Sequence, residues 1–117
     1  MTRNTVVYLR DILDNMNLAE EFVEGRAYDE FTADRKTVYA VLRCLEVVGE
    51  AAKNVPLPVR ERYPAIPWKD MAGMRDRLIH LYFGVSHEKI WRAVKEDIPA
   101  IKPFIEQALQ DLETQRQ

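Results

Sequence analysis

The segment VYAVLRCLEVVGEAA, residues 38–52, is the strongest structural signal in the chain, because its apolar residues recur every three or four positions. This spacing matches one face of a helix with about 3.6 residues per turn. The members of the stripe are Val38, Leu42, Leu45, Val48 and Ala52. Asp34 can cap the start of the helix, and Pro56 and Pro58 end it. The segment therefore predicts an amphipathic helix with one buried face.

Another stripe precedes this helix and predicts a first helix from near the N-terminus to Gly25. Its members are Val6, Leu9, Leu13, Met16 and Val23. We expect a short link through Tyr28 and Phe31 between the first two helices. Residues 55–67 are rich in proline, so they predict a connector with about one helical turn at residues 59–63.

The C-terminal half continues the helical pattern. Pro67 is suited to open a third helix that ends near Gly84, and Ser86 is suited to cap a fourth. The third stripe comprises Met71, Met74, Leu78 and Leu81, and the fourth Ile90, Val94, Ile98, Ile101, Ile105 and Leu112. Pro99 and Pro103 are expected to kink or restart the fourth helix near Asp97. We predict an all-α, up-and-down bundle of four or five helices, formed by one domain over residues 1–117.

Composition limits the class of protein. Charged residues make up 31% of the chain, and no apolar stretch approaches the roughly 20 residues that span a bilayer. The N-terminal residues lack the pattern of an export signal. Cys44 is the only cysteine, so an internal disulfide or a thiolate metal cluster is excluded, and its apolar neighbours predict a core position. We expect a cytoplasmic protein without a membrane partner.

The net charge of −2 argues against a protein that coats nucleic acid, but the charge is unevenly distributed. Residues 60–95 contain eight basic and four acidic side chains. The basic residues are Arg60, Arg62, Lys69, Arg75, Arg77, Lys89, Arg92 and Lys95. This basic segment could attract a polyanion locally, although charge runs are more often solvated helix faces.

The basic segment contains the sequence RDRLIHLY, residues 75–82, which places Arg75, His80 and Tyr82 close together in the chain. Arginine forks onto phosphate oxygens, and histidine both accepts and donates protons near neutral pH. Cleavage of RNA without a metal needs a general base, a general acid and a cation at phosphorus. Arg75 and His80 could supply most of this chemistry, and the Tyr82 hydroxyl could bond a phosphate or accept a nucleotidyl group.

Helical geometry separates the members of this motif. Arg75 and Tyr82 lie within about 20° of each other around a helix, whereas His80 lies about 140° from Arg75 and beside Asp76. Asp76 could orient the imidazole and favour its charged form. Arg75 and His80 can meet one phosphate if the helix deforms, if long side chains converge, or if two copies build a composite site. Taken alone, an arginine and a histidine at this spacing are more often structural than catalytic.

Other chemistry has little support in the sequence. His80 and His87 lack a clustered set of carboxylates, so no metal site is predicted, and His87 fits a helix start better than a ligand position. The chain has neither a glycine-rich phosphate loop nor a G-x-S-x-G sequence. Trp68 and Trp91 could stack on bases, but aromatic residues at helix starts more often anchor packing.

The stretch IPWKDMAGMRDRLIHLYFGV, residues 66–85, strongly resembles the HepT-like toxins of the HEPN superfamily. The resemblance depends on the full R-x4-H-x-Y pattern of Arg75, His80 and Tyr82, and it continues through Ile90-Trp91 and residues 97–99. The segment VGEAA, residues 48–52, also looks like the family, so the similarity covers most of the chain.

This resemblance implies a homodimeric HEPN bundle of four or five helices that cuts RNA without a metal or other cofactor. Arg75 and His80 would be its catalytic pair, and Asp76 a supporting residue. It further implies the toxin of a type VII toxin–antitoxin system, whose partner is an MntA-type minimal nucleotidyltransferase antitoxin. That partner would neutralise the toxin by transferring AMP from ATP to Tyr82, placing phosphate on the helix face of Arg75.

Two alternatives remain open from the sequence. Related HEPN domains are suspected of serving nucleotidyltransferases as non-catalytic partners that bind substrate or nucleotide. A structural helical adaptor is the third possibility, in which Arg75 and His80 would both be dispensable and core residues such as Met71 and Leu78 would matter most.

Overall fold

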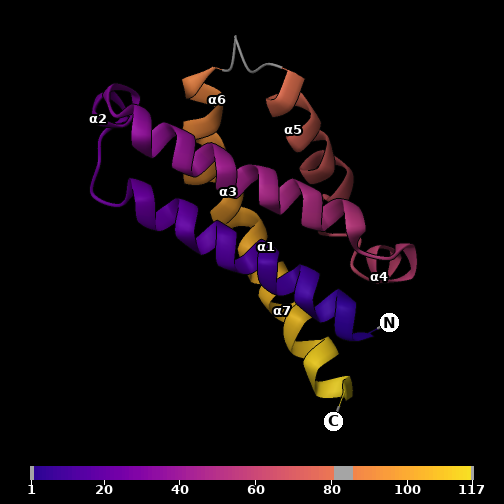
Figure 1. The fold of residues 1–117 in the computed structure, drawn as a ribbon. Coiled ribbons are helices and arrows are strands. Elements are labelled where there is room, and N and C mark those ends of the chain that lie inside the picture. The colour runs from indigo at the N-terminus through magenta and orange to yellow at the C-terminus, as the bar shows by residue number, and fades with distance from the viewer. Residues whose placement is uncertain (1, 81–85, 117) are drawn as a thin grey trace.

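The computed structural model describes the backbone of residues 2–80 and 86–116, and the side chains of residues 4–76 and 86–115 (Figure 1). Its elements are α1 (Thr2–Val23), α2 (Tyr28–Ala33), α3 (Arg35–Asn54), α4 (Leu57–Arg62), α5 (Trp68–His80), α6 (His87–Arg92), the π-helical turn η1 (Ala93–Asp97) and α7 (Ile98–Arg116). Within these residues there is no strand, so the predicted all-α class is confirmed.

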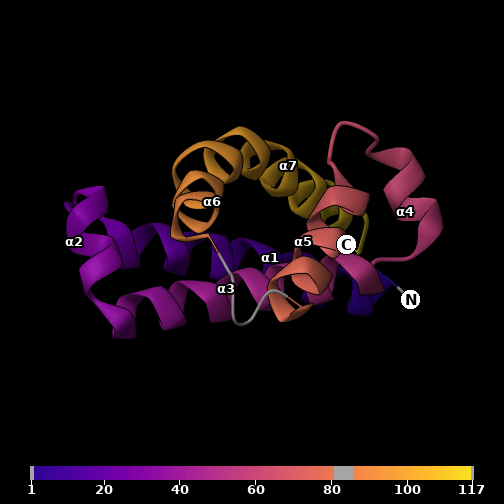
Figure 2. The same ribbon diagram turned by 90° about the horizontal axis from the view of Figure 1, so that it is seen from above.

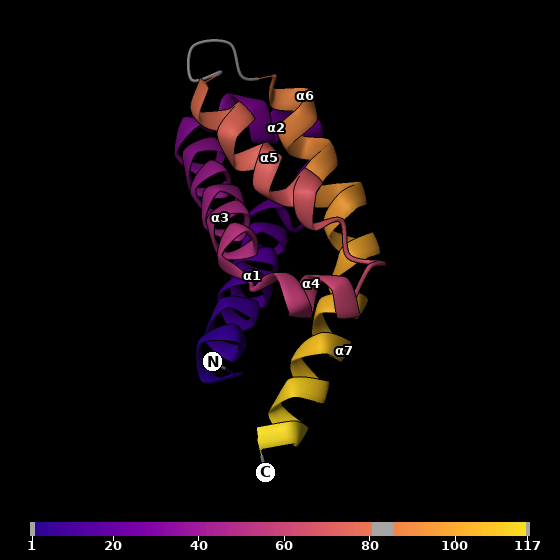
Figure 3. The ribbon, with the colours of Figure 1, turned by 90° about the vertical axis from the view of Figure 1, so that its right-hand side faces the viewer.

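The helices form two layers. Helices α1 and α3 lie side by side and antiparallel, while α5 and the continuous α6–η1–α7 helix cover one side of the pair (Figure 2). Helix α5 packs on α3, and α7 packs on α1. The short α4 crosses between α3 and α5 at one end of the molecule, and the last turns of α7 extend away from the body (Figure 3).

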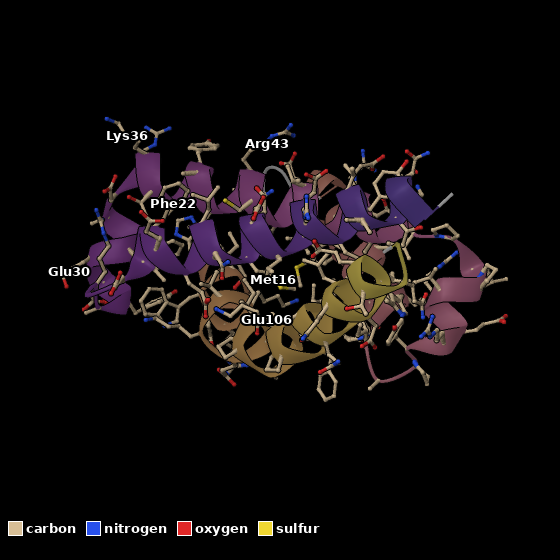
Figure 4. The ribbon with its side chains drawn as sticks, turned by 90° about the horizontal axis from the view of Figure 1, so that it is seen from below. Met16, Phe22, Glu30, Lys36, Arg43 and Glu106 are labelled. Carbon is tan, nitrogen blue, oxygen red and sulfur yellow. The ribbon has the colours of Figure 1, made fainter. Side chains whose placement is uncertain are left out.

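The predicted stripes supply the core between the layers. Buried residues of α1 include Val6, Leu9 and Met16, and Met16 lies between α1 and α7 (Figure 4). On the outer side of the α1–α3 layer, Lys36 and Arg43 project into solvent (Figure 4). Cys44 is buried as predicted, and burial raises the pKa of its thiol. The periodicity therefore located the core faces of the long helices correctly.

The expected link through Tyr28 and Phe31 is wrong, because these residues lie in helix α2. Glu30 accepts a hydrogen bond from the backbone N–H of Ala27 at 2.8 Å, which satisfies a donor at the helix start. The Phe31 side chain is fully buried. A six-residue helix is too short to show a convincing stripe, and this one forms because its end is capped and its aromatic residue is buried.

Asp34 caps α3 as predicted. Its carboxylate accepts hydrogen bonds from the Thr37 hydroxyl at 2.8 Å and the Thr37 backbone N–H at 3.3 Å. It also pairs with Arg26 at 2.8 Å. The bonds from Thr37, followed by that from Arg26, lower the pKa of Asp34 from 3.8 to about 2. One side chain thus connects the end of α1 with the start of α3.

The proline-rich connector forms a full short helix, α4, which begins earlier than the predicted turn at residues 59–63. Helix α5 begins at Trp68, one residue later than predicted, with the Pro67 carbonyl accepting a hydrogen bond from the Met71 N–H at 3.0 Å. The predicted end of this helix at Gly84, and Leu81 of its stripe, lie outside the described residues.

The predicted restart near Asp97 is wrong, because the chain stays helical from α6 into α7; the irregularity at this place is the π-helical turn η1. The N–H of Ile98 bonds to the carbonyl of Ala93, five residues earlier. In a regular α-helix the ring of Pro99 would collide with the carbonyl of Lys95. The wider π turn accommodates the proline and lets the helix continue without a restart.

Candidate functional site

The candidate site is built where α5 crosses α3, at Gly49. A Cβ atom added to Gly49 would lie 2.4 Å from Cβ of Arg75 and 2.9 Å from the backbone oxygen of Met71. Both distances are too short for a real side chain, so only glycine permits this approach of the two helices. The glycine in α3 therefore places the base of the Arg75 side chain directly on the α3 backbone.

Arg75 contacts two carboxylates beyond this crossing. Its Nε lies 2.8 Å from Oε2 of Glu50, and its Nη1 lies 3.3 Å from Oδ1 of Asp76. The Arg75 side chain is 30% exposed, whereas those of Glu50 and Asp76 are 51% and 52% exposed. Nη2 of Arg75 has no hydrogen-bond partner in the part of the chain that the structure describes. The partly exposed Arg75 side chain can be reached by an anion from solvent.

Glu50 was not identified as a site residue from the sequence. Its signal was indirect: a glycine in the interior of the strongest predicted helix, followed by a glutamate. Such a glycine is unfavourable for an isolated helix and often marks close packing against another backbone. Which helix packs there could not be read from spacing, because Glu50 and Arg75 meet only through the tertiary fold.

The remaining motif residues can be placed only in part. Helix α5 keeps α-helical geometry through His80, so the proposed deformation of the helix between Arg75 and His80 is wrong. The side chain of His80, and the whole of Tyr82, lie outside the described residues. Asp76 contacts Arg75, and its expected place beside the imidazole of His80 lies outside the described side chains. Side-chain convergence and a composite site between two copies remain as explanations.

Part of the charge in the basic segment is compensated within the fold. Arg92 pairs with Glu88 at 3.3 Å and with Glu96 at 3.9 Å. The Lys95 ammonium lies 5.0 Å from the centre of the Trp91 ring. Among the described side chains of this segment, Arg75 and Arg92 are the ones that pair with carboxylates. Attraction of a polyanion would depend on local geometry around Arg75 more than on bulk charge.

Both tryptophans anchor packing, as expected. The Trp68 indole N–H donates to the backbone oxygen of Tyr63 at 3.0 Å, and the side chain is buried. The Trp91 ring lies 5.2 Å from that of Phe31 and 5.8 Å from that of Tyr28, centre to centre. These contacts dock α6 on α2. His87 lies at the first turn of α6, which Ser86 caps by accepting a hydrogen bond from the Lys89 N–H at 3.3 Å.

A metal centre gains no support from the described residues. No group of three or more histidine, cysteine, aspartate or glutamate side chains is arranged among them to hold an ion. None of the described helices is both long enough and apolar enough to cross a membrane.

Comparison with known proteins shows which family the sequence resembles. The model of the family HepT-like, described as "Ribonuclease HepT-like", matches residues 12–108. A protein of Thermococcus cleftensis named "Probable ribonuclease HepT" is 48% identical over 102 residues, which cover 87% of this chain and 93% of the relative. A protein of Methanocaldococcus jannaschii named "Putative RNase MJ1216" is 46% identical over 111 residues, which cover 95% of this chain and 92% of the relative.

A third relative, from Caldanaerobacter subterraneus subsp. tengcongensis, is named "Putative RNase TTE0752" and is 41% identical over 103 residues, covering 88% of this chain and 92% of its own. Among solved structures, none matches the chain with significance. The all-α helical layers, together with the family match, are consistent with a bundle of the HEPN class. The chain belongs to the HepT-like ribonuclease family.

Proposed function

We propose that this chain is an endoribonuclease that cuts RNA without a metal, as the toxin of a type VII toxin–antitoxin system. The observation that carries the proposal is Arg75, fixed at the α3–α5 crossing with Nη2 free of partners among the described residues, in a member of a ribonuclease family. The three relatives compared above are each named as a ribonuclease or RNase. We further propose that residues 1–117 form one domain and act in the cytoplasm.

In this mechanism His80 takes the proton from a ribose 2′-hydroxyl, and the 2′-oxygen attacks the adjacent phosphorus. The bond from phosphorus to the 5′-oxygen breaks, and that oxygen receives a proton. Arg75 stabilises the negative charge that accumulates on the phosphoryl oxygens. Asp76 supports the pair from the same helix. The products are a 2′,3′-cyclic phosphate and a 5′-hydroxyl.

We propose that the active form is a homodimer. On the helix α5, positions 75 and 80 lie about 140° apart around the helix axis by regular helical geometry, which makes it difficult for one copy to aim Arg75 and His80 at one phosphate. Two copies whose basic segments face each other would combine Arg75 of one with His80 of the other. In this arrangement each site uses one histidine, and the leaving oxygen takes its proton from water.

Tyr82 is proposed as the control point of the toxin. It follows Arg75 by seven residues, a spacing of nearly two helical turns. An MntA-type nucleotidyltransferase antitoxin would transfer AMP from ATP to its hydroxyl, forming a phosphodiester and releasing pyrophosphate. The added phosphate and bulk would compete with RNA for Arg75.

The test is expression of the wild type, Arg75→Ala and His80→Ala without a partner, followed by mapping of RNA ends from the same cells. We expect only the wild type to arrest growth and to leave cyclic-phosphate ends. Folded variants that arrest growth as strongly as the wild type would contradict the assignment of both residues. Co-expression with a nucleotidyltransferase should then protect cells carrying the wild type and fail to protect those carrying Tyr82→Phe.

A second candidate function is a non-catalytic HEPN partner that binds nucleotide or substrate for a minimal nucleotidyltransferase. The pairing of Arg75 with two carboxylates favours it, because part of the arginine charge is already compensated. Under this alternative, Arg75→Ala weakens binding, His80→Ala has little effect, and purified wild-type protein leaves RNA intact.

A further inference from the structure

We propose that Glu50 is the positioning residue of the ribonuclease site. It holds the guanidinium of Arg75 in one orientation, so that Nη2 faces incoming phosphate. The inference rests on the proposed function and adds a residue from a second helix, outside the R-x4-H-x-Y motif, to the site. Glu50 acts through Arg75 and does not itself touch RNA.

The contact of Glu50 with Nε of Arg75 supports this role. A guanidinium has five N–H donors in a rigid plane, so fixing Nε and one further nitrogen fixes the direction of all of them. Glu50 binds Nε at 2.8 Å, the shorter of the two contacts of Arg75 with carboxylates. Asp76 lies next to Arg75 in sequence and reaches Nη1 at 3.3 Å. Nη2 is thereby left for a phosphate oxygen.

Gly49 provides the second argument, because it precedes Glu50 and supports the other end of the same side chain. Cβ of Arg75 lies against the α3 backbone at Gly49, while Nε is held by Glu50. Adjacent residues of α3 therefore constrain both the root and the head of Arg75. A free arginine loses considerable rotamer entropy on binding, and this arrangement removes that freedom before RNA arrives.

Because Glu50 is negatively charged, a positioning role can be distinguished from a role in binding RNA. A carboxylate beside the site repels the RNA backbone, so its removal should leave affinity unchanged or increase it. Removal should nevertheless slow cleavage, because Arg75 then samples orientations that do not meet the transition state. A slower chemical step together with equal or tighter binding is the signature of a positioning residue.

The experiment measures single-turnover cleavage of a short RNA at saturating protein, and the Kd of the same RNA with its 2′-hydroxyl at the cut replaced by hydrogen. We expect Glu50→Ala to lower the cleavage rate by about ten- to a hundredfold with an unchanged or lower Kd. Glu50→Gln should remain within about threefold of wild type, because its side chain keeps the length of Glu50 and still places a polar oxygen beside Nε. The matched control is Glu46→Ala, which removes a carboxylate one turn earlier on α3 that pairs with Arg43 and not with Arg75.

Glu50→Asp separates position from charge, since it keeps the carboxylate but shortens its reach by one methylene. We expect it to cleave slowly, like Glu50→Ala; a wild-type rate for Glu50→Asp would overturn the proposal. A Glu50→Gln variant as slow as Glu50→Ala would also overturn it, because the carboxylate would then act by its charge or as a base.

The same measurements distinguish a failure of the positioning role from a failure of the proposed function. If the wild type cleaves, Arg75→Ala does not, and Glu50→Ala matches the wild type, the positioning role fails while the ribonuclease stands. If the purified wild type fails to cleave RNA in the same assay, the proposed function fails and the role of Glu50 with it. Melting temperatures of all variants show whether a slow rate reflects loss of folding.

Discussion

Asp34 shows how one side chain at a helix junction ties stability to pH. Its folded-state pKa of about 2 lies below the ordinary value of 3.8, because Thr37 and Arg26 bond to the charged form. A lowered carboxyl pKa stabilises the folded state fully above the unfolded pKa. This contribution is lost as the pH falls from about 4 to about 2.

We therefore expect Asp34→Ala to lower the melting temperature by a few degrees at pH 7 and to matter progressively less below pH 4. Thermal unfolding of both proteins across this range measures the difference. Asp34→Asn, which keeps the side-chain acceptor but loses the charge, should fall between them. A difference that stays constant down to pH 2 would contradict the assignment of the pH dependence to Asp34.

Gly49 is the residue least able to accept a side chain. Gly49→Ala places a methyl group against Cβ of Arg75 and the backbone of Met71, neither of which is the mobile end of a side chain. We expect a loss of about 1 to 3 kcal/mol in the free energy of unfolding, as for other overpacked sites. Urea unfolding measures the loss, and RNA cleavage should fall because Arg75 moves with α5.

Gly25 provides the contrasting control, because it adopts a left-handed φ of +73° and has open space around its Cα. Gly25→Ala should cost stability through backbone strain alone and leave RNA cleavage per folded molecule unchanged. Equal effects of both substitutions on cleavage would show that Gly49 matters only for overall stability.

At the scale of the helices, α2 depends on tertiary contacts more than on its own sequence. Phe31 is completely buried, and its ring packs against Trp91 of α6. We expect Phe31→Ala to lower the free energy of unfolding by about 3 to 5 kcal/mol, since a large buried ring is removed. Tyr28→Ala is the matched control: Tyr28 also packs on Trp91, but it is partly exposed, so a smaller loss is expected.

The same comparison explains which helices the sequence could predict. Long helices with a sustained stripe, such as α1 and α3, were predicted with nearly correct ends, because their periodicity reflects the face that is buried. Helix α2 was missed because six residues cannot carry such a stripe. The prolines predicted a kink or restart near Asp97, but the sequence pattern did not show that the irregularity takes the form of a π turn within one continuous helix.

For the molecule as a whole, we predict that two copies of the chain together complete the site. If Arg75 of one copy works with His80 of the other, mixing Arg75→Ala and His80→Ala chains should regenerate one intact site in each mixed dimer. An equal mixture should then recover about one quarter of the wild-type cleavage rate. Each variant alone should remain inactive.

The mixture is prepared by unfolding and refolding the two chains together, and sedimentation at several protein concentrations verifies the dimer. Wild-type chains refolded in the same way provide the reference rate. No recovery of activity in a verified mixed dimer would place Arg75 and His80 of the same chain in each site.

The site was predictable only as far as it is local in sequence. Arg75, His80, Asp76 and Tyr82 were recognised because they lie within one short segment that resembles a family motif. Of these, the structure positions the side chains of Arg75 and Asp76. Glu50 entered only through the fold, because the contact joins residues 25 positions apart on two helices. The roles of all four residues remain predictions.

The π turn between α6 and α7 also changes the directions in which the side chains of α7 project around the helix axis. It holds one residue more than a regular turn, so every side chain of α7 is rotated by about 100° from where uninterrupted α-helical phase after α6 would place it. Trp91 can therefore face α2 while Ile105, further along the same rod, is buried in the core with α1. Deleting one residue from this turn is expected to misalign either the contact of α6 with α2 or the contact of α7 with α1 over its entire length. Exchanging the exposed side chains of the turn is not expected to do so.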